Sequence, residues 1–173
     1  MQAPGSPGPV SIIGLDPGLR HTGWGIIRQD GTHLSFVACG RIDSTATLAM
    51  AVRLRQLHEG LLAVFGAHRP DEAAVEETFV NRDPQSALKL GQARGIALLA
   101  PALMDCPVAE YAANVVKKTV VGAGHADKDQ VAMMVKVLLP KVTASSADAI
   151  DALAVAITHA QHRASRQRLA RLA

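Results

Sequence analysis

Residues 11–42 read SIIGLDPGLRHTGWGIIRQDGTHLSFVACGRI and contain three strand patterns separated by two turns. The apolar run Ser11–Leu15 predicts a buried strand, which a Pro-Gly pair ends. Thr22–Arg28 predicts a second strand, Asp30-Gly31 a tight hairpin turn, and Leu34–Ile42 a third strand. Strands joined by such short turns indicate an antiparallel meander.

The rest of the chain alternates between helix and strand patterns. In chain order we expect a helix capped by Ser44 or Thr45 and ending near Ala67, a strand over Glu72–Glu76, a helix over Gln85–Met104, a strand over Pro107–Glu110, and helices over Asn114–Val121, Asp127–Leu139 and Ser146–Leu172. Strands reached through helical crossovers should run parallel to the first strand. This order predicts an α/β, ribonuclease H-like fold, with a five-stranded mixed sheet flanked by helices.

Length and composition favour one soluble domain. The chain has 173 residues, of which 49% are apolar and only 3% aromatic, so Ala, Val, Leu and Ile build the core. We divide it into a flexible Pro/Gly-rich leader over 1–10, a ribonuclease H-like domain over 11–162 and a basic tail over 163–173. The leader lacks the apolar core of a signal peptide, and no window approaches a membrane span. Cys39 and Cys106 lack metal-ligand spacing and indicate a reducing compartment, so we expect a cytoplasmic protein.

The net charge of +3 is a weak signal for nucleic-acid binding. The segment His159–Ala173 contains four arginines and no acid, which leaves 14 basic residues against 15 acids in the remainder of the chain. A nucleic-acid site must therefore come from local placement of charge or from this tail. The tail is equally compatible with a solvated helix end.

Four carboxylates occupy the ends of predicted elements. Asp148 and Asp151 stand three residues apart in SSADAIDALA, at the start of a helix, and so project from one face of its first turn. Asp16 and Glu76 each end a predicted strand. Carboxylates gathered from separate elements repel one another and need cations, and hard divalent ions such as Mg²⁺ bind oxygen ligands of this kind. The pattern predicts a metal-dependent nuclease.

Each acid also has a purely structural interpretation. Asp16 precedes Pro-Gly and would suit a turn, and acids in the first turn of a helix are favoured by its dipole. The face below Asp148 and Asp151 continues with Val155, then Thr158 or His159, so it is partly apolar and turned toward the body. Glu76 and Glu77 point to opposite faces of a strand, and the residues alone leave open which one faces the site.

Five segments in this order resemble the RuvC family of Holliday-junction resolvases over about Ser11–His162. They are GLDPG at 14–18, VEETF at 75–79, SALKLGQARG at 86–95, VKKTVVGAG at 116–124 and ADAIDALA at 147–154. The resemblance implies a homodimeric endonuclease that cuts four-way DNA junctions with symmetric paired nicks in recombination and DNA repair. It also implies Mg²⁺ or Mn²⁺ as cofactor, and the RuvA–RuvB branch-migration complex as partner.

The resemblance assigns roles to seven residues. It implies that the metal-binding acids are Asp16, Glu76, Asp148 and Asp151, and it selects Glu76 over Glu77. Four such ligands suit two ions per subunit. Lys117 and Lys128 match lysines near the scissile phosphate, and Phe79 matches an aromatic that stacks on bases. Phe79 is otherwise a core residue, and Lys128 a surface lysine near a helix start.

Further basic and polar residues are candidates for DNA contacts. The loop after Glu76 and the three following helices supply Asn81, Arg82, Lys89, Arg94, Lys117, Lys118 and Lys128 for contacts with phosphates or bases. His125, in a glycine-containing loop, is either a DNA contact or ordinary polar surface. The helix over 85–104 is apolar almost all round, and Gly91 and Gly95 would let another helix approach, so we expect the homodimer to form there.

Two other functional classes fit parts of the sequence. Asp16-Pro-Gly18 with Thr22-Gly23 loosely fits the phosphate loop of ribonuclease H-fold ATPases and sugar kinases, which however need two domains to enclose a nucleotide. A non-catalytic junction-binding protein is the other alternative. Four intact acids argue against it, because carboxylates repel DNA unless a metal bridges them.

Overall fold

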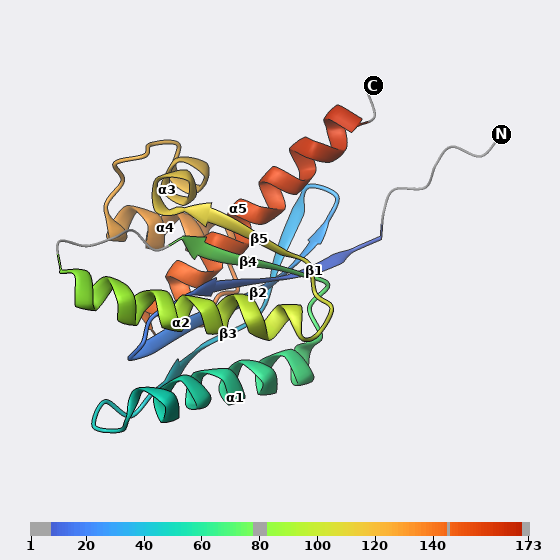
Figure 1. Cartoon of the computed structure of the whole chain (residues 1–173). Coiled ribbons are helices and arrows are strands. Elements are labelled where there is room, and N and C mark those ends of the chain that lie inside the picture. The colour runs from blue at the N-terminus through green and yellow to red at the C-terminus, as the bar shows by residue number, and fades with distance from the viewer. Residues whose placement is uncertain (1–7, 78–82, 145, 171–173) are drawn as a thin grey trace.

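The computed structural model describes residues 8–77, 83–144 and 146–170, with side chains to residue 165. Its elements follow the predicted order (Figure 1). They are β1 (Val10–Asp16), β2 (His21–Asp30), β3 (His33–Asp43), α1 (Met50–His68), β4 (Glu72–Glu77), α2 (Pro84–Ala102), β5 (Val108–Ala112), α3 (Ala113–Val121), α4 (Lys128–Leu138) and α5 (Ala147–Ala170).

The five strands form one mixed sheet in the order β3-β2-β1-β4-β5. β1 pairs antiparallel with β2, and β2 antiparallel with β3, through a two-residue hairpin in which Gly31 has a φ of 58°. β4 lies parallel to both β1 and β5, because the helices α1 and α2 carry the chain back across the sheet. The predicted ribonuclease H-like arrangement is confirmed.

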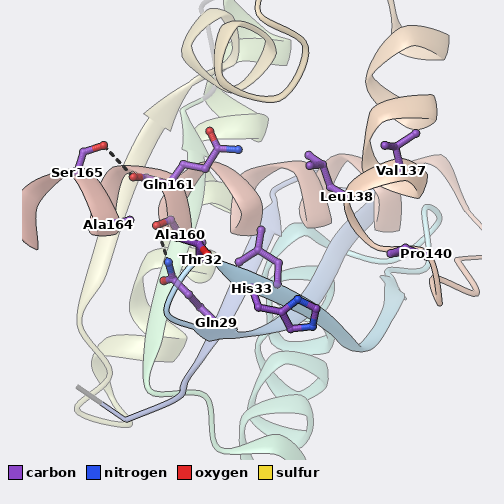
Figure 2. Close-up of a pocket in the computed structure, with 11 residues that line it drawn as sticks. Gln29, Thr32, His33, Val137, Leu138, Pro140, Ala160, Gln161, Ala164 and Ser165 are labelled. Carbon is purple, nitrogen blue, oxygen red and sulfur yellow. Dashed lines mark hydrogen bonds between the residues drawn. The ribbon is translucent and has the colours of Figure 1, made fainter. Parts of the chain in front are cut away.

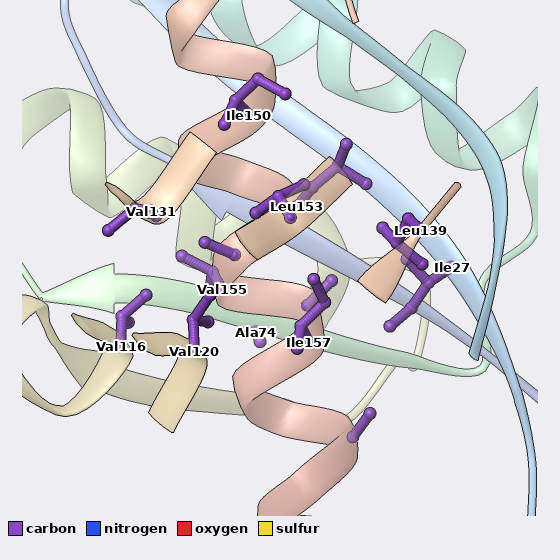
Figure 3. Close-up of a cluster of buried hydrophobic side chains, with 14 of the residues drawn as sticks. Ile27, Ala74, Val116, Val120, Val131, Leu139, Ile150, Leu153, Val155 and Ile157 are labelled. Carbon is purple, nitrogen blue, oxygen red and sulfur yellow. The ribbon is translucent and has the colours of Figure 1, made fainter. Parts of the chain in front are cut away.

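Helices cover both faces of the sheet. Figure 1 shows α1 and α2 on one side and α3, α4 and α5 on the other. Alternation along the strands separates the two cores: Ile13 and Ala73 pack with α1 and α2, whereas Ile12 and Ala74 pack with α3, α4 and α5. Figure 3 shows the second of these clusters, in which side chains of α5 lie among those of the sheet and the other two helices.

Helix α5 lies directly on β1 and β2. A Cβ at Gly14 would come within 2.0 Å of the Ala152 carbonyl oxygen, and one at Gly23 within 2.0 Å of the Asp148 carbonyl oxygen. Only glycine permits this approach of helix backbone to strand backbone. The close packing fixes the first turn of α5 over the ends of β1 and β2.

One expected boundary is wrong: α1 begins at Met50 rather than after Ser44 or Thr45. The Ser44 hydroxyl instead donates a hydrogen bond to the Leu19 carbonyl and accepts one from Arg53 Nε at 3.1 Å. Ser44 thus ties the end of β3 to the β1–β2 connection and is not available to cap a helix. Other boundaries differ from expectation by up to two residues, and α5 runs without a break from the domain into the basic segment.

Within the part of the chain that the structure describes, no helix is long and apolar enough to cross a membrane. Cys39 and Cys106 are both free thiols, and Cys106 is buried.

Candidate active site

The parallel pairing of β1 and β4 brings Asp16 and Glu76 to the same edge of the sheet. The residues before them, Leu15 and Val75, are paired. By the alternation of each strand, both carboxylates lie on the face that α5 covers, while Glu77 points to the other face and is exposed. The strand geometry therefore places Glu76, rather than Glu77, on the same side as Asp16, a point that the residues alone left open.

The first turn of α5 brings Asp148 and Asp151 to this edge. The Ser146 hydroxyl accepts a hydrogen bond from the Ala149 backbone N–H at 3.2 Å, so a serine caps this helix end. Both acids are therefore free to point at the strands. The helix beyond them is buried from Ala152 to Ala160, which confirms that this face turns toward the body.

The Asp16 carboxyl is in an environment that disfavours its charge. Burial, followed by the neighbouring Glu76, Asp151 and Asp148 carboxylates, raises the pKa of Asp16 from 3.8 to about 8. The neutral Asp16 carboxyl donates a hydrogen bond to Glu76, which adds to the shift. A carboxyl with a pKa this high marks a site where burial and neighbouring acids outweigh the positive charge nearby.

The pKa values of Glu76 and Asp151 are raised for similar reasons. Burial and then the Asp151 charge raise the pKa of Glu76, against smaller opposing effects of Asp16, Lys128 and Lys117. Burial also raises the pKa of Asp151, although Lys128 opposes it. The acids interact with one another and with two lysines. The protonation of each acid at this edge of the sheet therefore depends on the charges of the others.

A pocket of about 270 Å³ opens at this edge of the sheet. It is lined by three of the acids, two lysines and an apolar wall: Asp16, Glu76, Asp151, Lys117, Lys128, Ala113, Val116, Val131 and Ala154. Lys128 Nζ lies 3.6 Å from Asp151 Oδ2. The apolar wall lowers the local dielectric constant, which strengthens the interactions of any charge held there.

Asp148 is not among the residues that line this pocket. Its Oδ2 lies 3.7 Å from Arg41 Nη1, on the side of β3. Arg41 is itself held by Asp43, with Arg41 Nε 2.7 Å from Asp43 Oδ1. The sequence analysis did not identify Arg41, since only the pairing of β2 with β3 and the position of α5 bring it near the acids.

The remaining candidate residues lie in different environments. Lys89, Lys118 and His125 are exposed. Arg94 forms an ion pair with Glu110, so the positive charge of Arg94 is already balanced within the protein. Phe79, Asn81 and Arg82 fall in 78–82, outside the residues that the structure describes.

Among the described residues, no group of three or more Asp, Glu, His or Cys side chains is positioned to hold an ion as it stands. The donor chemistry nevertheless fits a hard divalent cation, because the gathered side chains are oxygen ligands. Besides burial, repulsion by the neighbouring acids raises the pKa of Asp16, and a bound cation would offset that repulsion. Asp16, Glu76, Asp148 and Asp151 are the residues available to such an ion.

A larger pocket, of about 540 Å³, lies at the opposite end of the sheet. Figure 2 shows it between the β2–β3 hairpin, the end of α4 and α5, with Gln29 hydrogen-bonded to the Ala160 carbonyl. Among the residues whose side chains the structure describes, its lining contains no Asp, Glu, Lys or Arg.

Residues 12–159 match the family described as crossover junction endodeoxyribonuclease RuvC. This chain belongs to the RuvC family. The protein of that name from Methylocella silvestris is 69% identical over 157 residues, which cover 91% of this chain and 89% of the relative. The one from Bradyrhizobium diazoefficiens is 63% identical over 158 residues, covering 91% and 90%. The resemblance carried by the five sequence segments is confirmed.

A solved structure agrees with the sequence relatives. The structure described as T. thermophilus RuvC in complex with Holliday junction substrate has a TM-score of 0.84 and 32% identity, and covers 91% of this chain and 96% of that chain. As a RuvC-family member, this chain is a crossover junction endodeoxyribonuclease. Membership of this nuclease family implies dependence on a divalent metal.

Proposed function

We propose that this RuvC-family protein resolves four-way DNA junctions by metal-dependent, symmetric paired nicking in recombination and DNA repair. The observation that carries the proposal is the convergence of β1, β4 and α5 on one pocket, where acids adjoin two lysines. Such a constellation suits hydrolysis of a phosphodiester, whose negative charge resists attack unless cations offset it.

The proposed ligands are Asp16, Glu76, Asp148 and Asp151, with two Mg²⁺ or Mn²⁺ ions per subunit. When bound, such ions supply an activated water and positive charge at the leaving 3′ oxygen. The protein holds two ligands on adjacent strands and two on one helix turn. This division between rigid elements would keep the ligands in place while the DNA strand enters.

Lys117 and Lys128 are the proposed cationic side chains of the reaction. Both line the acidic pocket, and the ammonium of Lys128 already lies close to Asp151. An ammonium in this position would offset charge that develops on the phosphate in the transition state. Their role is to stabilise that charge rather than to bind the ions.

DNA contacts outside the pocket are proposed for seven further residues. Phe79 would stack on a base opened at the junction. Phosphate and polar contacts are assigned to Asn81, Arg82, Lys89, Arg94, Lys118 and His125. Arg94 would have to exchange its ion pair with Glu110 for a phosphate.

A homodimer formed through α2 would give the paired cuts. Leu88 and Leu99 of this helix are exposed, and nothing lies within 4 Å of a Cβ built at Gly91 or Gly95. A helix of a second copy could approach this open side closely, and a two-fold dimer would match the near two-fold symmetry of a four-way junction. A cytoplasmic location, supported by the two free thiols, and the RuvA–RuvB complex as partner complete the proposal.

The test is to incubate end-labelled four-way junctions and linear duplexes with the protein in EDTA, Mg²⁺ or Mn²⁺. We expect symmetric nicks in two opposing strands of the junction, only with metal, and no cutting of duplex. Binding without cutting under all conditions would favour a non-catalytic junction-binding protein. Heat stabilisation by ATP without cutting would favour the phosphate-binding ATPase relative.

A further inference from the structure

One row of residues across three strands leads from the acidic pocket to Arg41. Asp16 of β1 is paired with Gly23 of β2, and Gly23 is paired with Arg41 of β3. Paired residues of adjacent strands point to the same face, so Asp16 and Arg41 both face α5. The Asp148 backbone lies directly over Gly23, between them. The Asp148 side chain can therefore turn toward Asp16 or toward Arg41.

In this structure the Asp148 side chain is turned toward Arg41. The two side chains form an ion pair with 3.7 Å between Nη1 and Oδ2, and both are about one-third exposed, at 38% and 32%. This is the same residue that is missing from the lining of the acidic pocket. The arginine thus holds one of the four acids at the outer side of the cluster.

Arg41 is fixed in this position from its other side. Its Nε lies 2.7 Å and its Nη2 3.3 Å from the two carboxylate oxygens of Asp43, a fork that orients the guanidinium plane. Asp43 is in turn bonded to His21 Nδ1 at 2.7 Å. With two of its nitrogens engaged by Asp43, the guanidinium presents Nη1 to Asp148.

We propose that Arg41 is a positioning residue that acts as an internal counter-ion for Asp148, so that metal binding requires Asp148 to exchange the guanidinium for an ion. This inference rests on the proposed metal site. It explains why the acids gather but, among the described residues, no three of them are positioned to hold an ion together. The cost of the exchange lowers the affinity of the resting site for metal.

The test compares Mn²⁺ affinity by isothermal titration calorimetry without DNA. The Arg41→Met/Asp43→Asn variant removes one positive and one negative charge, so net charge is unchanged and Asn can still accept a hydrogen bond from His21. We expect it to bind Mn²⁺ about two- to fivefold more tightly than wild type, the range set by an ion pair of this exposure. Loosening of the fold would not produce tighter binding.

The neutral Arg55→Met/Glu59→Gln variant is the matched control. That pair also lies 3.7 Å apart but is on α1, well exposed and away from the acids. The Mn²⁺ affinity of this control variant should therefore equal that of the wild type. If Arg41→Met/Asp43→Asn melts early, Arg41→Gln/Asp43→Asn keeps two amides that can hydrogen-bond and carries the same expectation. Unchanged or weaker Mn²⁺ binding in a folded variant would overturn the role of Arg41. Absence of Mn²⁺ binding in the wild type at millimolar metal would overturn the metal site itself.

Discussion

At the scale of single residues, the site is defined by charges that the fold leaves unbalanced. Asp16 is held among other acids and has a pKa of about 8, so it keeps a proton where an isolated aspartate would not. By contrast, the negative charge of Glu72, at the far end of β4, is balanced by neighbouring side chains. Although burial opposes it, hydrogen bonds from His159 and Arg163 lower the pKa of Glu72. Unbalanced acids favour cation binding, whereas balanced ones contribute to the structure.

The raised pKa of Asp16 predicts a specific pH dependence of stability in EDTA. Its contribution is fully present below about pH 4 and is lost as the pH rises toward 8, because the folded state holds a proton that the unfolded state has released. Asp16→Asn lacks this titrating carboxyl and therefore its contribution to stability. The difference in unfolding free energy between wild type and variant, from urea titrations at pH 5 to 8, should shift steadily in favour of the variant. A difference that does not change with pH would contradict the assignment.

Substitution of Lys128 tests whether its ammonium group stabilises negative charge in the transition state. Lys128→Met should lower the cleavage rate by about tenfold to a hundredfold, less than for a buried donor because its side chain is 82% exposed. Junction affinity, measured by mobility shift in Ca²⁺, should change little. Lys136→Met on the same helix is the control, since Lys136 is exposed and is not among the pocket-lining residues. Equal rates for both variants would remove Lys128 from the reaction.

At the scale of elements, α5 determines the position of the site. It carries two of the acids and is also the most buried helix of the structure as described, with every residue from Ala152 to Ala160 buried. The glycines of β1 and β2 let its backbone touch the strands. Displacement of α5 would therefore change both the core and the distances between acids.

A buried side chain of α5 shows this coupling. Leu153 is fully buried in the core of that face, so Leu153→Ala should lower the free energy of unfolding by about 2–5 kcal/mol. Val137→Ala on α4, where the side chain is 61% exposed, should change it by no more than about 0.5 kcal/mol. Urea denaturation at pH 7 measures both. Similar losses in the two variants would show that α5 does not anchor the domain.

The sequence predicted the elements and nominated the candidate acids, for identifiable reasons. Asp16 ends an apolar strand pattern, and Asp148 and Asp151 open a helical one, so local pattern was sufficient to nominate them. Glu76 was separated from Glu77 only by the family resemblance. The start of α1 was not predictable, because Ser44 bonds to Leu19, which is 25 residues away in the sequence. Arg41 was missed since its place depends on strand register and on where α5 crosses the sheet.

At the scale of the whole molecule, paired nicking needs two sites at a fixed separation. We expect the protein to sediment as a dimer at micromolar concentration. Leu99→Glu, on the exposed side of α2, should give a monomer because a charge would be buried at the contact. Met133→Glu on α4, where the side chain is 61% exposed, should remain dimeric. A wild-type monomer, or dissociation of both variants alike, would contradict the α2 interface.

The most direct test of the acidic cluster is cleavage of a labelled four-way junction during a Mn²⁺ titration, with wild type and Asp151→Asn side by side. Wild type should give no product in EDTA and increasing product as metal is added. Asp151→Asn should bind the junction with similar affinity but leave it uncut at every metal concentration. Cutting by wild type in EDTA, or normal nicking by the variant, would show that these carboxylates do not act through bound cations.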